Sequence, residues 1–168
     1  MRWLKLIIWV IASLFVLWCG AVLTRVYVLD FYRAASNSMY PNIRVGAIVW
    51  GNKLAYRTSS QVKRGDIIYY HVRVDGLDEV FPQRVIGLPG DTVETVKTSV
   101  YLNGNRLPQK LVRTEAGFDI YQENIDAIVY EIAIQRPIDT PQVNQRVVVP
   151  PDSFYVLGDN RIRARDSR

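Results

Sequence analysis

Two serine hydroxyls, on Ser36 and Ser38, stand two positions apart just before a turn at Pro41. A serine hydroxyl becomes an effective nucleophile only when a neighbouring group takes its proton. Taken alone, Ser-x-Ser before a proline turn is usually an ordinary loop. Chemistry at Ser38 therefore needs a base from elsewhere in the chain, and His71 is the only histidine.

Residues 81–91 combine a short strand with a tight turn. Gln83-Arg84-Val85-Ile86 favours a strand, because β-branched neighbours suit a pleated surface. Leu88-Pro89-Gly90-Asp91 favours a type II turn, since proline presets φ for the first central position and glycine supplies the positive φ of the second. Strand followed by turn is common in β scaffolds, so the identity of the residues carries the functional signal.

Four segments together resemble the bacterial type I signal peptidases, the serine/lysine endopeptidases that remove export signals. Residues 36–43 match the box Ser-x-Ser-Met-x-Pro-Thr-Leu, and residues 64–67 match the strand start Arg-Gly-Asp-Ile/Val. Residues 83–91 align with Lys-Arg-Val-Ile-Gly-Leu-Pro-Gly-Asp, with Gln83 in place of the lysine. Residues 158–168 align with Gly-Asp-Asn-Arg-Asp-Asn-Ser-x-Asp-Ser-Arg, with Ile162-Arg163 in place of Asp-Asn and Ala164 in place of the serine. The segments come in the family's order and cover nearly all of the chain after its N-terminal apolar stretch.

The resemblance implies a role for each matched position. Ser38 occupies the nucleophile position, and Ser36 would donate its hydroxyl to the oxyanion beside the backbone N–H of Ser38. In the family a lysine acts as general base, and Gln83 occupies that position. An amide has no useful basicity, so cleavage should fall by several orders of magnitude. The serine that orients the lysine is matched by Ala164, which fits the same loss.

Further positions carry over from the same match. Met39, Ile43, Phe81 and Pro82 would line the cleft for the substrate. The residues expected to hold the structure near the site are Arg84, Asp159, Arg161, Ala164, Asp166 and Arg168, and in the family Asp166 and Arg168 form a charge cluster with the arginine matched by Arg84.

The stretch from Leu6 to Leu23 holds eighteen residues without a charge. That length favours a membrane-spanning helix. A cleaved signal peptide is the alternative, but its apolar region is normally shorter, ~7–15 residues, and is followed by a small-residue cleavage site. A lipid-modified Cys19 is disfavoured by the preceding Trp18. We expect a retained anchor over residues 1–24.

Composition excludes several function classes. The single cysteine allows no intrachain disulfide, and the single histidine allows no multi-histidine metal site. The net charge of +5 comes without zinc-ligand spacing or a basic helix, so we expect no nucleic-acid partner. Attraction to anionic lipid headgroups fits the charge better. We expect no metal and no cofactor.

The expected fold is mostly β, with one N-terminal transmembrane helix followed by a signal-peptidase-like ectodomain of coiled antiparallel sheets. Residues 25–168 would form this β domain, and residues 92–146 roughly a smaller non-catalytic β subdomain. Strands are expected over residues 25–33, 45–50 and 128–134. Hairpin turns are expected at Asp75-Gly76 and Asn103-Gly104.

Two functions remain open on the sequence, beside a purely structural membrane subunit. The first is a degenerate homologue that binds exported proteins, either signal-peptide-bearing or pilus-like, without cleaving them. The second is an active membrane-bound serine endopeptidase with a substitute base, for which His71 is the only imidazole. In either case the resemblance implies a single-pass protein of the inner (cytoplasmic) membrane, with a cytoplasmic N-terminus and the β domain on the outer face. The oligomeric state is not predicted.

Overall fold

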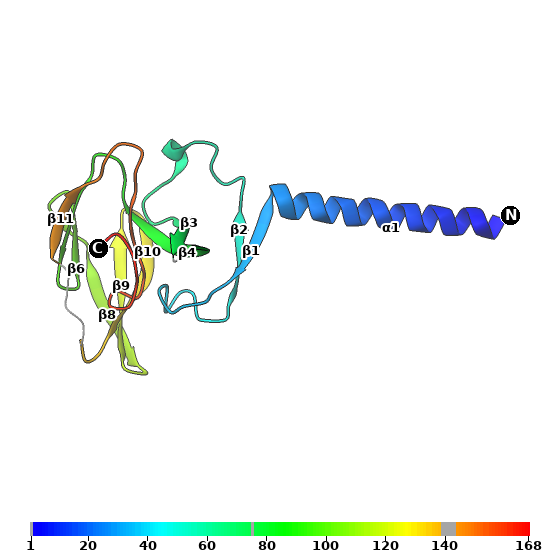
Figure 1. Cartoon of the computed structure of the whole chain (residues 1–168). Helices are drawn as coiled ribbons and strands as arrows, with labels where there is room; N and C mark the ends of the chain where they lie inside the picture. Colours follow the sequence, from blue (N-terminus) through cyan, green and yellow to red (C-terminus); the bar gives the residue numbers. More distant parts are fainter. Residues whose placement is uncertain (1, 75, 139–143) are drawn as a thin grey trace. The chain divides into compact units, whose positions relative to one another are not determined.

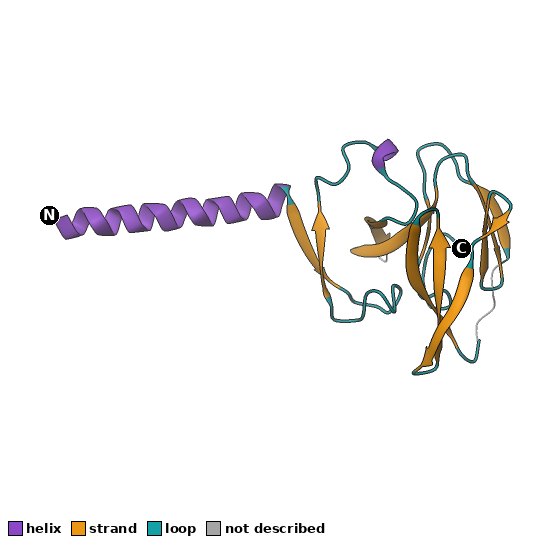
Figure 2. Cartoon of the chain, turned by 180° about the vertical axis from the view of Figure 1, so that it is seen from behind, coloured by secondary structure: helices purple, strands orange, loops and turns teal. Residues whose placement is uncertain are grey.

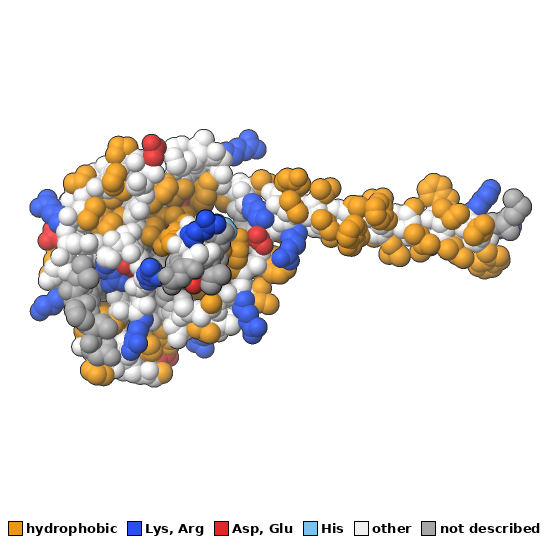
Figure 3. All heavy atoms as spheres, in the orientation of Figure 1, with side chains coloured by type: hydrophobic (Ala, Val, Ile, Leu, Met, Phe, Trp, Pro, Cys, Tyr) orange, Lys and Arg blue, Asp and Glu red, His pale blue; other side chains and the backbone are white. Residues whose placement is uncertain are grey.

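A single helix, α1 (Arg2–Tyr27), opens the chain in the computed structural model, which describes residues 2–74, 76–138 and 144–168. Its apolar side chains are exposed all round, and its most apolar 18-residue window has a mean hydropathy of 2.6. Figure 3 shows hydrophobic side chains along the whole visible side of the helix. The hydroxyls of Ser13 and Thr24 donate to the carbonyls of Trp9 and Gly20, so they present no free polar group to lipid. The helix is thus long and apolar enough to cross a membrane.

The helix and a two-stranded sheet form one compact unit, made of residues 1–32 and 48–57. The sheet pairs β1 (Leu29–Arg33) with β2 (Ile48–Asn52). The strand expected from residue 25 begins only at Leu29, because the helix continues through Tyr27. Lys53 explains the difference: its Nζ donates to the carbonyls of Arg25 and Val26 and satisfies acceptors that a helix end leaves free.

The second unit, residues 33–47 and 58–168, contains three antiparallel sheets. Figure 1 labels most of the strands, and Figure 2 separates strands from loops. The sheet orders are β12-β4-β3, β11-β5-β6-β7 and β10-β9-β8. The strands are β3 (Ile67–Val74), β4 (Leu77–Gly87), β5 (Thr92–Val96), β6 (Ser99–Leu102), β7 (Asn105–Arg106), β8 (Gln109–Glu115), β9 (Phe118–Ile125), β10 (Ile128–Gln135), β11 (Gln145–Val148) and β12 (Tyr155–Leu157), and a short 3-10 helix, η1 (Ser59–Gln61), precedes β3. The predicted fold class is confirmed.

The turns expected from the sequence are present in the structure. Gly90 has φ +87°, and the Asp91 N–H donates to the Leu88 carbonyl at 3.0 Å. Asn103 and Gly104 both have positive φ and join β6 to β7. At the β3–β4 hairpin Gly76 has φ +82°, whereas Asp75 lies outside the described residues. The strand expected at 45–50 begins at Ile48, after a turn at Gly46.

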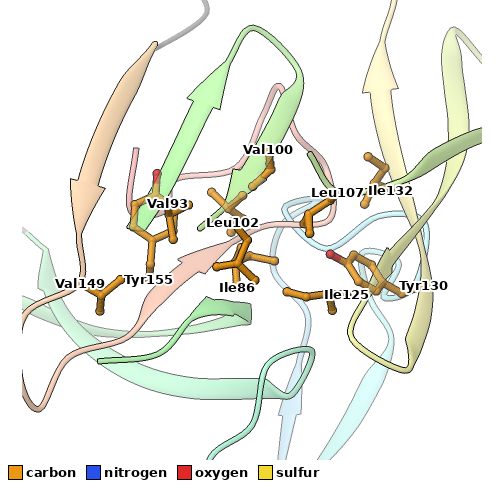
Figure 4. Packing of buried hydrophobic residues seen from close by; sticks show 11 residues of the cluster. Ile86, Val93, Val100, Leu102, Leu107, Ile125, Tyr130, Ile132, Val149 and Tyr155 are labelled. Atoms are coloured by element: carbon orange, nitrogen blue, oxygen red, sulfur yellow. The ribbon is translucent and has the colours of Figure 1, made fainter. Parts of the chain in front are cut away.

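One hydrophobic cluster joins all three sheets of the second unit. Figure 4 shows its side chains converging, with Ile86 of β4 against Leu102 of β6 and Ile125 of β9 near Tyr130 of β10. Tyr155 and Leu157 of β12 belong to the same cluster. Residues 92–146 therefore share their core with β4 and β12, and the smaller subdomain remains a proposal. This shared core fixes β4 and β12, the two strands that lead into the candidate site.

Asp91 ties the turn after β4 to its surroundings. Its carboxylate accepts hydrogen bonds from the side chains of Arg64 and Asn103 and from the backbone N–H of Leu88. Burial opposes ionisation of Asp91, but these bonds outweigh it and hold the pKa below its ordinary value. A group whose pKa falls on folding stabilises the fold above its unfolded pKa, about 3.9, and loses that contribution as the pH drops through the folded pKa.

We therefore expect Asp91→Asn to lower the free energy of unfolding at pH 7 by about 1–3 kcal/mol and to weaken its fall in acid. The measurement is urea unfolding of the full chain in detergent at pH 3 to 7, followed by near-UV circular dichroism. Asp152→Asn, at an exposed aspartate, is the matched control. Equal pH dependence in both variants would contradict the assigned role of Asp91.

Candidate active site

Ser38 lies in a tight loop that the C-terminal box holds in place. The Tyr40 N–H donates to the carbonyl of Asn37 at 3.1 Å, which closes a turn around Ser38. Asn160 then binds this turn twice: its backbone N–H donates to the Ser38 carbonyl at 3.0 Å, and its Nδ2 donates to the Asn37 carbonyl at 3.2 Å. Ser38 is only 6% exposed. The backbone of the predicted nucleophile is therefore fixed by residues 122 positions away.

The two serine hydroxyls are bonded to each other. Ser36 Oγ donates to Ser38 Oγ at 3.1 Å, and the Ser38 N–H points to Ser36 Oγ at 3.4 Å. These two groups are the donors that the family resemblance assigns to the oxyanion. In this arrangement both are used within the loop, so stabilising an oxyanion would first require the Ser36 hydroxyl to rotate.

Gln83 lies on β4 with no exposed surface. Its Nε2 donates to the carbonyl of Arg165 at 3.0 Å, which fixes the orientation of the amide. Its Oε1 is buried and, among the described residues, has no hydrogen-bond partner. A buried acceptor without a partner costs about 1–3 kcal/mol. The position matched to the general base thus carries a neutral, buried amide that ties down the C-terminal segment.

Gly158 shows how closely the predicted residues meet. A Cβ added to Gly158 would lie 2.2 Å from Ala164 Cβ, 2.5 Å from the Ser38 carbonyl oxygen and 3.1 Å from Gln83 Oε1. Only glycine fits this close approach of three chain segments. The structure therefore brings Ser38, Gln83 and Ala164 around one point, while their roles in chemistry remain a proposal.

Arg84, the neighbour of Gln83, makes a buried ion pair with Asp159. Its Nε and Nη2 donate to the two carboxylate oxygens of Asp159, each at 2.8 Å, and its Nη1 donates to the Gly65 carbonyl at 2.7 Å. The guanidinium also lies 4.1 Å from the centre of the Tyr130 ring. Asn42 Nδ2 completes the set by donating to Asp159 at 2.7 Å. The pair is thus bidentate and fully surrounded by partners.

The other predicted charges form two separate pairs. Arg161, 2% exposed, binds the buried carboxylate of Glu123. Arg168 binds Asp166 at 2.6 Å, and Asp166 also accepts the Gly158 N–H at 3.0 Å. The charge cluster expected around Arg84 is therefore divided, because Arg84 takes Asp159 while Arg168 takes Asp166.

The residues expected to line a substrate cleft differ in exposure. Met39 is 1% and Ile43 is 9% exposed, so both lie in the interior behind the loop. Phe81 and Pro82 are half-buried on β4. A peptide that binds here would meet Phe81 and Pro82 at the surface, and it would reach Met39 or Ile43 only if the loop moved.

Strand pairing decides which side chains share a face with Gln83. β3 pairs Tyr70 with Phe81 and His71 with Val80. Because side chains alternate along a strand, Phe81 and Tyr70 share the face of Gln83, whereas His71 belongs to the opposite face. Burial raises the pKa of Tyr70, and the nearby Asp166 carboxylate adds to this effect. Tyr70 therefore stays protonated at neutral pH, and His71 is poorly placed to replace a base at Gln83.

Sequence reasoning missed two residues that organise the site, Asn42 and Glu123. Asn42 stands inside a matched segment but looked like a loop residue. Glu123 had a usable signal, because it alternates with Tyr121 and Ile125 on one face of β9 and is buried there. A carboxylate on a buried strand face requires a partner, here Arg161.

Across residues 2–74, 76–138 and 144–168, no three His, Cys, Asp or Glu side chains lie close enough to hold a metal ion. What the arrangement offers is a buried hydroxyl, a neutral amide and a rigid frame of hydrogen bonds.

Asn160→Ala should loosen the Ser38 loop, because it removes the bond to the Asn37 carbonyl while leaving the backbone bond to Ser38. We expect faster hydrogen exchange at residues 36–40 and a loss of about 1–3 kcal/mol in the free energy of unfolding. Hydrogen-exchange mass spectrometry of the full chain measures the first effect. Asn105→Ala, at an exposed residue of β7, should leave exchange in that segment unchanged. An equal effect of both variants would contradict the role assigned to Asn160 in holding the Ser38 loop.

Several known proteins are similar to this chain over most of its length. Signal peptidase I of Bacillus caldolyticus is 30% identical over 154 residues, which cover 92% of this chain and 77% of the relative. Signal peptidase I of Pseudomonas aeruginosa is 28% identical over 160 residues, covering 86% of this chain, and the match spans only 56% of the relative's length. Signal peptidase IB of Staphylococcus aureus is 27% identical over 143 residues, 84% of this chain and 69% of the relative.

The family model described as signal peptidase, peptidase S26, matches residues 2–168, which is all but the first residue. The matched boxes, the antiparallel fold behind an apolar helix and the frame around Ser38 are consistent with this match. The chain belongs to the signal peptidase S26 family.

Proposed function

We propose that this protein is a degenerate signal peptidase that binds exported polypeptides at the membrane surface and does not cleave them. The observation that carries the proposal is Gln83: a neutral amide stands beside the Ser38 backbone where the family resemblance expects a lysine. Helix α1 would serve as a retained anchor, with its N-terminus in the cytoplasm and the β domain on the outer face. The proposed partners are exported preproteins or pilus-like subunits.

Several features of the site support the absence of cleavage. Ser38 Oγ accepts a hydrogen bond from Ser36 Oγ, and no other hydrogen bond of the Ser38 hydroxyl is present in the described part of the chain. An amide cannot take the serine proton, and general-base catalysis contributes ~10²–10⁴-fold in rate. Ala164 fills the place where a hydroxyl would orient a lysine. The nucleophile therefore has neither a base nor free oxyanion donors.

Binding makes different demands, and the chain still meets them. Strand addition needs a sheet edge with free backbone groups, and pockets for alternate side chains then give specificity. In the described sheets β12 pairs with β4 only between Arg84 and Gly87, so residues 77–83 of β4 have a strand partner on one side only, which is β3. The sheet β12-β4-β3 is anchored through the shared core and through the Arg84–Asp159 pair. Half-buried Phe81 and Tyr70 beside Gln83 offer an apolar surface for small side chains of an extended segment.

The first test is cleavage of a preprotein with small residues at positions −1 and −3, using the full chain in detergent. The unaltered protein should cut no faster than Ser38→Ala. The double variant Gln83→Lys with Ala164→Ser should gain Ser38-dependent cleavage, ~10²–10⁴-fold above background, because it restores a base and its orienting hydroxyl. The gain should grow with pH as the introduced lysine loses its proton.

Gln83→Met is the matched control, since it fills the same space without a basic group. It should remain inactive. Cleavage by the unaltered chain that disappears in Ser38→Ala would refute the proposal and establish the alternative, an active endopeptidase with a substitute base.

The second test is binding. A labelled peptide carrying the same small residues should bind the full chain and remain intact, and replacing both small residues by tyrosine should abolish binding. Fluorescence anisotropy measures the affinity. If both peptides bind equally well, or if neither binds, the proposed recognition of small residues is refuted. That outcome would favour a purely structural role.

A further inference from the structure

A depression of about 460 Å³ adjoins the Ser38 loop. Asn37, Tyr40 and Arg44 of the loop form one wall, and Glu115 and Phe118 beside the β8–β9 turn form the other. Asn37 stands between the two serines in the chain, so the depression shares the Ser38 loop with the proposed peptide site. Nothing in the matched boxes assigns it a role.

The aromatic part of the depression is held in place before any ligand arrives. The rings of Tyr40 and Phe118 pack with centroids 5.0 Å apart at 45°. Tyr40 also donates its hydroxyl to Glu115 at 3.0 Å. Burial raises the pKa of Tyr40, and the hydrogen bond to Glu115 adds to it, so the hydroxyl remains a donor. The opposite wall is fixed by the Arg136 N–H, which donates to the Gly117 carbonyl at 2.7 Å.

The charged groups in and beside the depression are unevenly paired. Glu115 is already engaged, by Arg113 at 3.2 Å and by the Tyr40 hydroxyl. Arg113 is itself bound to Glu131 by two hydrogen bonds. Arg44 is exposed, and within the described residues no carboxylate lies within ion-pair distance of it. Among the described residues, the Arg44 guanidinium is thus the charged group of the depression that has no ion-pair partner, and it shares the lining with the rings of Tyr40 and Phe118.

We infer that this depression is a second recognition subsite, which takes one acidic side chain of the polypeptide bound at Ser38. The inference rests on the proposed function. A glutamate or aspartate could accept two parallel hydrogen bonds from Arg44, while its methylene groups pack on Tyr40 and Phe118. Asn37 and Arg44 lie one and six positions from Ser38 in the chain and line the same depression, so we expect the acidic residue within a few positions of the small residues of an extended segment.

Charge complementarity favours an acidic polypeptide over an apolar one, because an apolar side chain would cover Arg44 and leave its charge desolvated. It also distinguishes this subsite from the Ser38 site, where Ser36, Ser38 and Gln83 are neutral side chains. The two subsites together would select small residues at one place and a negative charge a short distance along the chain.

The experiment uses the full chain in detergent and intact labelled peptides with fixed small residues. Glutamate, glutamine or lysine is placed in turn at each of four positions on both sides of the small residues, and dissociation constants are measured by anisotropy at low salt. At one position the glutamate peptide should bind about fivefold more tightly than the glutamine peptide, an effect of the size expected for a partly exposed ion pair.

Arg44→Ala should remove this preference while changing the affinity for the glutamine peptide less than twofold. Arg44→Glu should reverse it in favour of lysine. Arg106→Ala, which removes an exposed arginine from a different depression, is the matched control and should keep the preference for glutamate. The same loss in Arg44→Ala and Arg106→Ala would overturn the inference, since net charge alone would then explain it.

The outcomes separate the inference from the proposed function. If binding still requires small residues but shows no Arg44-dependent preference at any position, the subsite is refuted and the proposed function stands. If tyrosine peptides bind as well as small-residue peptides, or if no peptide binds, both the subsite and the proposed function are refuted. Arg44→Ala could instead alter only the binding of the protein to vesicles that contain phosphatidylglycerol and leave the peptide preference unchanged. The guanidinium would then bind lipid headgroups, and the inference would be wrong.

Discussion

The buried pair between Arg84 and Asp159 is the contact on which the rest of the candidate site depends. Removing a guanidinium and a carboxylate from water is costly, and the cost is offset only with good geometry and full satisfaction of the remaining groups. Here the bidentate contact, the Gly65 carbonyl, the Asn42 amide and the Tyr130 ring supply these partners. Replacing either Arg84 or Asp159 by a neutral residue would leave the other as an unpaired buried charge.

The chain neighbours of this pair are the residues of the site. Gln83 precedes Arg84, while Gly158 and Asn160 flank Asp159. Because β4 alternates its side chains, the pair lies on one face of the strand and presents Gln83 on the other. Asn160 in turn fixes the Ser38 carbonyl. The hydrogen bonds around Arg84 and Asp159 can therefore persist unchanged whether or not the residue at position 83 is basic.

The sequence was most informative where structure depends on neighbours in the chain. The apolar run at 6–23, the turn at Gly90 and the hairpin at Asn103-Gly104 follow from local sterics and hydropathy, and all three are present. The family resemblance added the meeting of Ser38, Gln83 and Ala164, which no local pattern contains. The hydrogen bonds that hold the site together were harder to predict, because Glu123 and Asn42 bind partners 38 and 117 positions away in the chain. The late start of β1 has the same cause, since Lys53 satisfies helix carbonyls 27 and 28 positions earlier.

An amide at position 83 also changes what a calorimeter would record. The hydroxyls of Ser36 and Ser38 and the amide of Gln83 do not ionise near neutral pH. A ligand that docks against them displaces no proton, so the heat of that contact is the same in buffers of high and low ionisation enthalpy. A desolvated lysine, whose pKa lies near neutrality, would shed or gain a fraction of a proton on every encounter. Replacing the lysine by an amide thus removes proton uptake and release at position 83 from any contact made there.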